Sequence, residues 1–287
     1  MIPLTKLKKD VQFNGELTKV VDVLKGIAAA RFHVLERQLS IFDLFFKVCD
    51  DFLGMVNFDF VDHPFTRPAN EKVSVLMITS DGGFLGGLNN QVVTTGIRQG
   101  GASALLTVIG ERGVAALRDI HKECDAFPGI QDPSRFPLAL AVRDHLVRQI
   151  LSGESGQLLV VYPKAVSFSV QKVVTETLLP FQVSVPQGKG RLPISDVLWE
   201  SKPKDVVEYL VTHWMGRRLD AIFALSRLAE LSARSVHLEG SFQELTHIGK
   251  KLRLHYFRAR HEIIDRSMRE IFAAQLLYGR QENEPRC

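Results

Sequence analysis

Apolar residues recur at helical spacing through nearly the whole last third of the chain, from 204 to 284. Leu231, Leu238, Leu245 and Leu252 stand seven residues apart, and no proline interrupts the stretch. A periodic run of this length without a stop signal is typical of a coiled-coil strand rather than of an ordinary globular helix. The pattern therefore predicts one long helix that packs against a partner helix.

The first 55 residues predict a second long helix with an apolar seam of its own. The residues of the seam alternate at spacings of four and three, and a second row runs beside them. The seam consists of Leu17, Val21, Leu24, Ala28, Arg31 and Leu35, and the second row of Phe32, Leu39 and Phe46. Gly15 and Gly26 each weaken this helix by about 1 kcal/mol relative to alanine, so it needs a partner. We expect the partner to be the C-terminal helix, with the two chain ends forming an antiparallel coiled coil.

Between the two helices the pattern changes to short apolar runs that alternate with helical segments. The predicted strands cover residues 73–79, 104–109, 158–162 and 166–178, and the predicted helices cover 90–99, 111–122 and 137–151. Such alternation indicates an α/β layer with at least part of the sheet parallel. The expected fold class is thus α/β: an antiparallel coiled coil of the two terminal helices with an inserted Rossmann-like domain.

These elements suggest a division of the chain into segments. Prolines and glycines between 182 and 199 mark a linker back into the last helix. The expected segments are an N-terminal coiled-coil helix (1–55), a central α/β domain (70–182), a C-terminal coiled-coil helix (200–278) and a tail (279–287).

The amino-acid composition indicates what class of protein this chain belongs to. With 45% hydrophobic and 24% charged residues, the chain is typical of a folded soluble protein. No run approaches the ~18–20 apolar residues of a membrane-spanning helix, and the start lacks a secretory signal, so we expect the chain to stay on the side of the membrane where it is made. Cys49, Cys124 and Cys287 are odd in number and far apart, which favours reduced thiols over disulfides or a zinc site.

The glycine-rich stretch from Ser80 to Asn89 is the one segment that looks like a binding loop. A strand, a glycine-rich turn and a helix in succession resemble the phosphate cradles of nucleotide-binding proteins. However, Leu88 and Asn89 stand where a P-loop needs Lys and Ser or Thr, and G-x-G-x-x-G is absent. A structural turn is the favoured interpretation, and a nucleotide-binding loop is the alternative.

No catalytic, cofactor-binding or metal-binding residues are predicted. The nine histidines include no i, i+4 pair of the kind that zinc hydrolases use. A serine nucleophile elbow, paired catalytic carboxylates and a C-x-x-C are not visible either. Catalysis by this chain alone is therefore not expected.

Two basic clusters lie near the two ends of the chain, which has a net charge of +4. One consists of Lys6, Lys8 and Lys9, and the other of Arg253, Arg258, Arg260, His261, Arg266 and Arg269. In an antiparallel helix pair the two clusters would share one region. They form either a solvated face or a contact surface for acidic loops of a partner. Nucleic acid is disfavoured because the clusters lack interleaved aromatic residues and a binding motif.

Several short motifs, spread over nearly the whole length of the chain, occur in the order in which one protein family carries them. The glycine-rich stretch resembles the family segment I-T-S-D-x-G-L-C-G-G-L-N, through Ile78 to Asp81, Gly83, and Gly86 to Asn89. Ala28 to Arg31 is similar to A-A-A-K. Trp199-Glu200 with Pro203 is similar to the family's aromatic-E-P-D-P entry into the last helix. Glu230, Ala233 and Arg234 resemble its motif S-E-x-x-A-R-M. Near the end of the chain, Arg258-Ala259-Arg260 resembles its N-K-A-R-Q, and Ile264 with Glu270-Ile271 resembles its I-T-x-E-I-x-E-I.

Together these motifs resemble the γ subunit of F-type ATP synthases. The resemblance implies a non-catalytic rotor shaft inside a ring of α and β subunits, on an ε subunit and a membrane c-ring. It implies no cofactor and no nucleic acid. Membrane association would come through the complex only, at the cytoplasmic face of the bacterial inner membrane. The partner contacts expected from it and from the basic clusters are Lys8, Lys9, Arg31, Ser80, Asp81, Asn89, Arg258, Arg260, His261, Ile264, Arg266, Met268, Arg269 and Ile271.

The chain also departs from the family pattern, which suggests a divergent member or a second rotary ATPase of the same organism. The departures include Gly82 and Leu85 for Arg and Cys, Gly26 for Met, and His261, Asp265 and Ser267 for Gln, Thr and Glu. Two other functions stay open at this point: an independent nucleotide-binding α/β protein, and a coiled-coil adaptor with a basic nucleic-acid-binding face.

Overall fold

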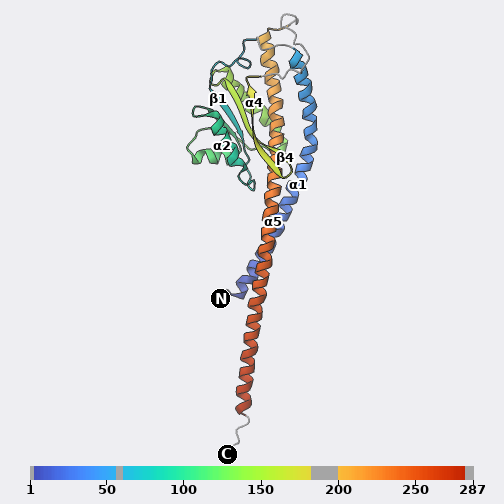
Figure 1. The fold of residues 1–287 in the computed structure, drawn as a ribbon, viewed down its shortest axis with the longest axis vertical. Coiled ribbons are helices and arrows are strands. Elements are labelled where there is room, and N and C mark those ends of the chain that lie inside the picture. The colour runs from blue at the N-terminus through green and yellow to red at the C-terminus, as the bar shows by residue number, and fades with distance from the viewer. Residues whose placement is uncertain (1–2, 56–60, 182–199, 282–287) are drawn as a thin grey trace, which may run out of the picture. The chain divides into compact units, whose positions relative to one another are not determined.

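The computed structural model describes residues 3–55, 61–181 and 200–281, with the backbone alone for 40–45, 47–55 and 276–281. In chain order, one long helix precedes and another follows a five-stranded sheet with its own helices (Figure 1). The elements are α1 (Leu4–Met55), β1 (Val73–Ile78), α2 (Leu88–Gly100), β2 (Leu105–Ile109), α3 (Glu111–Asp119), β3 (Asp125–Phe127), η2 (Asp132–Ser134), α4 (Arg135–Leu151), β4 (Gln157–Ser167), β5 (Val170–Leu179) and α5 (Pro203–Gln281). The predicted α/β fold class is confirmed, whereas the short strand β3 was not predicted, and the linker from 182 lies outside the described residues up to Trp199.

The sheet has the strand order β3-β2-β1-β4-β5. Its first four strands are parallel, and β5 pairs antiparallel with β4 as a hairpin. Successive residues of β1 point to opposite faces, as the pleat requires. Val75 and Met77 pack with α2 and α3 on one face, while Leu76 and Ile78 pack with α4 and α5 on the other. The near-continuous apolar run of β1 follows from this double burial.

The first part of α5 belongs to the core of this α/β body. Val207, Val211, Met215, Leu219 and Ile222 recur at spacings of four and three, and all are buried against the sheet and α4. Asp220 is the buried carboxylate of this stretch of α5, and its Oδ1 accepts a hydrogen bond from Arg135 Nε at 2.7 Å. α5 is therefore fixed to the sheet before it continues as a coiled-coil strand.

The tip of the β4–β5 hairpin packs against both long helices. Phe168 meets Phe32 of α1 edge to face, with ring centroids 5.0 Å apart, and lies in a cluster with Leu228 and Leu231 of α5. Ser232 Oγ donates to the carbonyl oxygen of Phe168 at 2.6 Å. This contact explains why a serine stands fully buried on α5.

α1 and α5 pair antiparallel, as the sequence predicts. Asn14 Nδ2 donates to the carbonyl oxygen of Leu245 at 3.1 Å, and Lys25 Nζ lies 3.0 Å from Glu239 Oε2. Phe32 and Leu35 pack with Leu228 and Leu231. As the residue numbers increase along α1, the residue numbers of the contacting positions on α5 therefore decrease.

The seam predicted on α1 is only partly correct. Val21, Ala28 and Leu35 are buried, but Leu17 and Leu24 are 37% and 41% exposed and Arg31 is exposed. The buried positions are instead seven residues apart (Leu7, Asn14, Val21, Ala28, Leu35), with Phe32 beside them. The apolar rows of α1 overlap, and the row that faces α5 is the one that includes every seventh residue from Leu7 to Leu35, so Leu17 and Leu24 are turned outward. In the second row Phe32 and Leu39 pack in this cluster, and Phe46 lies under the guanidinium of Arg218.

By packing, the chain forms two compact units. One, the helical unit, comprises Met1–Gly26 with Leu238–Cys287, and the other, the α/β unit, comprises Ile27–His237. The expected central domain (70–182) therefore shares its unit with parts of both long helices. No helix within the described ranges combines the length and the apolarity needed to cross a membrane.

Candidate interaction surfaces

The end of α5 carries most of the predicted contact residues, and it is exposed throughout. Every residue from Arg260 to Gln275 lies open to solvent. At about 100° per residue, Ile264, Met268, Ile271 and Phe272 fall within an arc of about 100° on one side of the helix. They are 45%, 51%, 55% and 59% exposed. Four charged residues lie well outside this arc, namely Glu262, Arg266, Arg269 and Glu270, whereas Asp265 lies at its edge beside Phe272. The helix end is therefore amphipathic, and its apolar arc is not covered by any part of the chain that the structure describes.

The charged side of this helix end is held by weak bonds of the helix itself. Arg266 Nε lies 3.3 Å from Glu270 Oε1, with both side chains about 70% exposed. Arg269 Nε donates to the carbonyl oxygen of Asp265 at 3.2 Å. Exposed pairs of this kind contribute about 0–1 kcal/mol, so the arginines can exchange partners at little cost.

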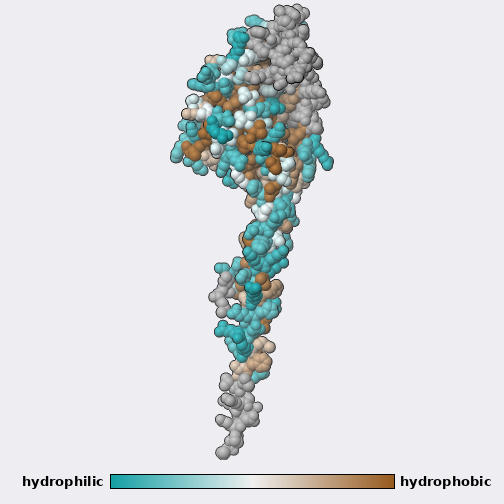
Figure 2. Space-filling view, viewed as in Figure 1, coloured by the Kyte–Doolittle hydropathy of each residue, from teal (hydrophilic) through white to brown (hydrophobic). Residues whose placement is uncertain are grey.

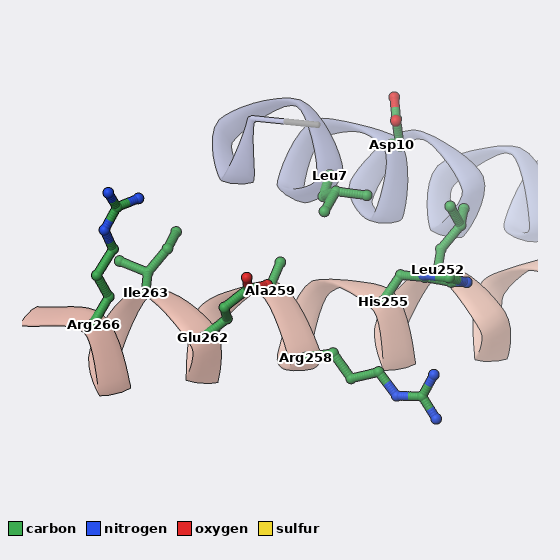
Figure 3. A pocket seen from close by; sticks show the side chains of 9 residues that line it. All are labelled: Leu7, Asp10, Leu252, His255, Arg258, Ala259, Glu262, Ile263 and Arg266. Atoms are coloured by element: carbon green, nitrogen blue, oxygen red, sulfur yellow. The ribbon is translucent and has the colours of Figure 1, made fainter. Parts of the chain in front are cut away.

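The start of α1 and the end of α5 share one groove in the helical unit. The groove has a volume of about 450 Å³ and is lined by Leu7, Asp10, Leu252, His255, Arg258, Ala259, Glu262, Ile263 and Arg266 (Figure 3). Ala259 and Ile263 point toward α1, whereas Arg258 points away from it (Figure 3). Lys8 and Lys9 are exposed between Leu7 and Asp10. The structure thus brings the two predicted basic clusters into one region.

An apolar stripe on the outer side of α1 was missed as a surface. Phe13, Leu17, Val20, Leu24 and Ile27 follow a four-three spacing and are between 37% and 67% exposed. The spacing was visible in the sequence, but part of it was assigned to the buried seam. Brown apolar patches lie among the teal residues of the helical unit (Figure 2). An exposed apolar stripe of this length is typical of an interaction surface.

Ser80 and Asn89, two predicted contact residues, hold the glycine-rich loop together. Ser80 Oγ donates to the carbonyl oxygen of Gly82 at 2.9 Å, and Asn89 Nδ2 donates to Ser80 Oγ at 3.0 Å. Asp81 is exposed, and its Oδ1 accepts a hydrogen bond from the backbone N–H of Glu111 at 2.9 Å. That bond satisfies a free N–H at the start of α3. These three side chains are thus engaged within the loop and its neighbours.

The glycines of this loop let side chains of α5 approach its backbone. A Cβ at Gly82 would lie 2.6 Å from Arg234 Nη2, and one at Gly86 would meet the ring of His237. Gly86 also has a φ of +59°, which favours glycine. The contacts give the loop the structural role that the sequence favoured.

Glu230 and Arg234, which carried part of the family resemblance, are the α5 side of that contact. The buried carboxylate of Glu230 accepts from Arg227 Nη1 and Arg234 Nη2, both at 2.6 Å. Arg234 Nε in turn lies 3.4 Å from the carbonyl oxygen of Gly83. Glu230 therefore orients Arg234, and Arg234 ties the loop to α5.

One ion pair links the two helices in the helical unit. Hydrogen bonds first to Asp22 and then to Glu239 raise the pKa of the Lys25 ammonium above its ordinary 10.5. Hydrogen bonds from Lys25 and Gln243 lower the pKa of the Glu239 carboxyl below its ordinary 4.5. The pair therefore stays charged across the neutral range. Within the described ranges, no three His, Cys, Asp or Glu side chains gather as a metal site would require.

Comparison with known proteins relates the chain to a family. The chain is 26% identical to the ATP synthase gamma chain of Chlorobaculum tepidum, over 74% of this chain and 76% of the relative. It is 25% identical to that of Chlorobium phaeobacteroides, over 92% of this chain and 93% of the relative.

Solved structures show the same fold. A chain of the Euglena gracilis mitochondrial ATP synthase, in a structure of OSCP, F1 and c-ring, matches with a TM-score of 0.68 and 15% identity, over 99% of this chain and 97% of that one. A chain of the central stalk and c-ring of the Tetrahymena thermophila mitochondrial ATP synthase matches with a TM-score of 0.58 and 16% identity, over 77% and 99%. The family model described as ATP synthase matches residues 4–275. The chain therefore belongs to the ATP synthase family, and the curated relatives that it resembles are gamma chains of that enzyme.

Proposed function

We propose that this chain is the central-stalk rotor subunit of an F-type ATP synthase or ATPase. Its partners would be the α and β subunits of the catalytic ring, the ε subunit and the membrane c-ring. Nucleotide chemistry would take place on β. The complex would lie at the cytoplasmic face of a bacterial inner membrane, with this chain held there through the complex only.

The observation that carries this proposal is the amphipathic, unpartnered end of α5. A shaft that coordinates several identical sites must differ from side to side, because it has to favour a different conformation in each neighbour. Ile264, Met268 and Ile271 face one way, and Arg266 and Glu270 face the other. Rotation of this helix end would bring first an apolar and then a charged surface before each ring subunit.

The contacts that such a shaft makes must also be released at every step. Apolar side chains that are about half exposed, together with arginines in weak pairs, provide contacts of that kind. Lys8 and Lys9 with Arg258, Arg260 and His261 would extend the basic part of this surface to acidic loops of the ring. Arg31, which lies open on α1, would contribute farther along.

Reconstitution with α and β subunits tests the proposal. We expect the purified chain to have no ATPase activity, to copurify with α and β, and to raise the turnover of the ring. Replacing Ile264, Met268 and Ile271 together by Ser should lower that stimulated turnover by about ten-fold or more, because apolar contact area is lost.

The matched control replaces residues on the opposite side of the same helix, Glu262 and Glu270, by Ser. We expect this variant to retain most of the stimulation. A ring that is stable and fully active without the chain would contradict the proposed function. Equal losses in the two variants would contradict the role of the apolar side.

A further inference from the structure

The exposed side of α5 near its end carries a heptad seam that no described part of the chain covers. Its positions alternate at spacings of three and four residues, which is the a and d pattern of a coiled coil. We call this set the outer seam, and it consists of Leu254, Phe257, His261, Ile264, Met268 and Ile271. Its apolar side chains are between 45% and 55% exposed.

The outer seam lies on the side of α5 that faces away from α1. Ala259 and Ile263 point toward α1 in the groove that the two helices share (Figure 3). At about 100° per residue, Phe257 and His261 lie on the opposite side of the helix from these two residues. Another helix can therefore pack on the outer seam without displacing α1.

A strict three-four repeat indicates what kind of surface covers the seam. Such a repeat stays in contact with its partner along its length only if the partner is another helix that supercoils with it. A second copy of this chain presents the same seam, and two identical seams can pair about a two-fold axis. From Leu254 to Ile271 the seam covers about two and a half heptads, which is short for a coiled coil, so we expect a weak pair.

The charged residues beside the outer seam disfavour a parallel pair. Arg258 and Asp265 occupy successive e positions on one flank, and Arg253 and Arg260 occupy successive g positions on the other. In a parallel pair, g faces the e position of the next heptad on the second helix. Arg253 would then oppose Arg258 of the second copy, and this repulsion would offset the attraction between Arg260 and Asp265. The polar His261 would also face its own copy within the seam.

The same charges favour one antiparallel register. In an antiparallel pair e faces e, and one register places Arg258 opposite Asp265 of the second copy, twice by symmetry. A shift by one heptad in either direction would oppose two copies of Arg258 or two copies of Asp265. The layers of the favoured register are Leu254 with Ile271, Phe257 with Met268, and His261 with Ile264.

We propose that the free chain forms a two-fold symmetric dimer through the outer seam, with the two α5 ends antiparallel and two Arg258–Asp265 ion pairs across the interface. This inference goes beyond the proposed function and does not depend on it. In a rotor subunit, Ile264, Met268 and Ile271 would be covered either by the second copy or by the catalytic ring. The dimer would then keep the apolar residues of an unassembled chain out of water.

Sedimentation equilibrium of the purified natural chain under reducing conditions tests the dimer. We expect a monomer–dimer equilibrium with a dissociation constant between about 1 and 100 μM. Arg258→Asp and Asp265→Arg should each raise this constant by about ten-fold or more, because each turns two attractive contacts into two repulsive ones. The double variant exchanges the two charges, and it should restore the constant to within about three-fold of the natural value.

Arg253→Asp is the matched control, because it makes the same change of charge on the other flank of the seam. In the favoured register position 253 faces Ala274 of the second copy, so we expect the dissociation constant to change by less than about two-fold. In a parallel pair the new carboxylate would face Arg258, and the dimer would become tighter.

Three results would each overturn the proposal: a natural chain that stays monomeric at several hundred micromolar (on the order of the upper limit above), a double variant no tighter than the single ones, and a dimer tightened by Arg253→Asp. Association that continues beyond the dimer and ignores these charges would also overturn it. None of these results concerns binding to α and β subunits, which the reconstitution measures, so the proposed function would still stand.

Discussion

Tyr162 shows how single residues fix α5 to the sheet. Its hydroxyl donates to Glu176 Oε2 at 3.1 Å, and Glu176 Oε1 accepts from Arg218 Nε of α5 at 2.6 Å. The tyrosine is 2% exposed. Burial, and then the charge of Glu176, raise the pKa of its hydroxyl above the ordinary value of 10.0. A chain of bonds from β4 through β5 to α5 thus depends on one proton.

This pKa shift predicts a loss of stability at alkaline pH. The folded chain holds the Tyr162 proton to higher pH than the unfolded chain does, so its contribution is complete below about pH 10 and falls as pH rises above that value. We expect the melting temperature of the natural chain to fall more steeply than that of Tyr162→Phe between about pH 9.5 and 11. Parallel curves in a circular dichroism melt series would show that Tyr162 does not carry this dependence.

At the scale of the elements, the two long helices are paired but locally weakened by glycines. A Cβ at Gly26 of α1 or at Gly240 of α5 would have no neighbour within 4 Å. Packing therefore does not require glycine at either position. Gly249 differs, because a Cβ there would lie 2.7 Å from Asn14 Nδ2, the group that bonds the carbonyl oxygen of Leu245.

Alanine substitutions should separate these two kinds of glycine. Gly26→Ala and Gly240→Ala should each stabilise the chain by about 0.5–1 kcal/mol, since alanine favours the helix and meets no obstacle. Gly249→Ala should gain nothing or lose stability, because its methyl group displaces Asn14. Denaturant unfolding of the three variants measures the difference. A gain at Gly249 equal to that at Gly26 would contradict the described packing of Asn14.

The long periodic segments made the elements largely predictable, but the sides of the helices were harder to assign. The apolar pattern of β1 and the leucine row of α5 are strong signals, and both proved correct. Leu17 and Leu24 were placed in the buried seam because α1 carries two four-three rows, and spacing alone does not tell which row faces the partner. β3, with three residues, is too short to give a periodic signal.

The contact surfaces were less predictable than the fold. The exposure of Ile264, Met268 and Ile271 depends on where α1 begins along α5, which no local pattern in the sequence reveals. Ser80 and Asn89 were singled out by resemblance, but their side chains bond within the loop, and their role as partner contacts stays a prediction.

At the scale of the whole molecule, the chain joins one unit built around a sheet to one built of two helices. α5 belongs to both, buried on the sheet at Val211 and Met215 and open to solvent at Met268 and Ile271. A continuous helix of 79 residues spans about 120 Å at 1.5 Å per residue. A rotor role would use this shared helix to connect the two units.

Rotation of the chain within the ring tests this account most directly. The ring would be immobilised, and a bead attached through Ser103→Cys, an exposed position of the α/β unit, after replacement of Cys49, Cys124 and Cys287 by Ser. With ATP we expect the bead to turn continuously in one direction, and to stop when ATP is removed. A bead that stays fixed or only fluctuates, on rings that hydrolyse ATP at the full stimulated rate, would contradict the claim that this chain is the rotor.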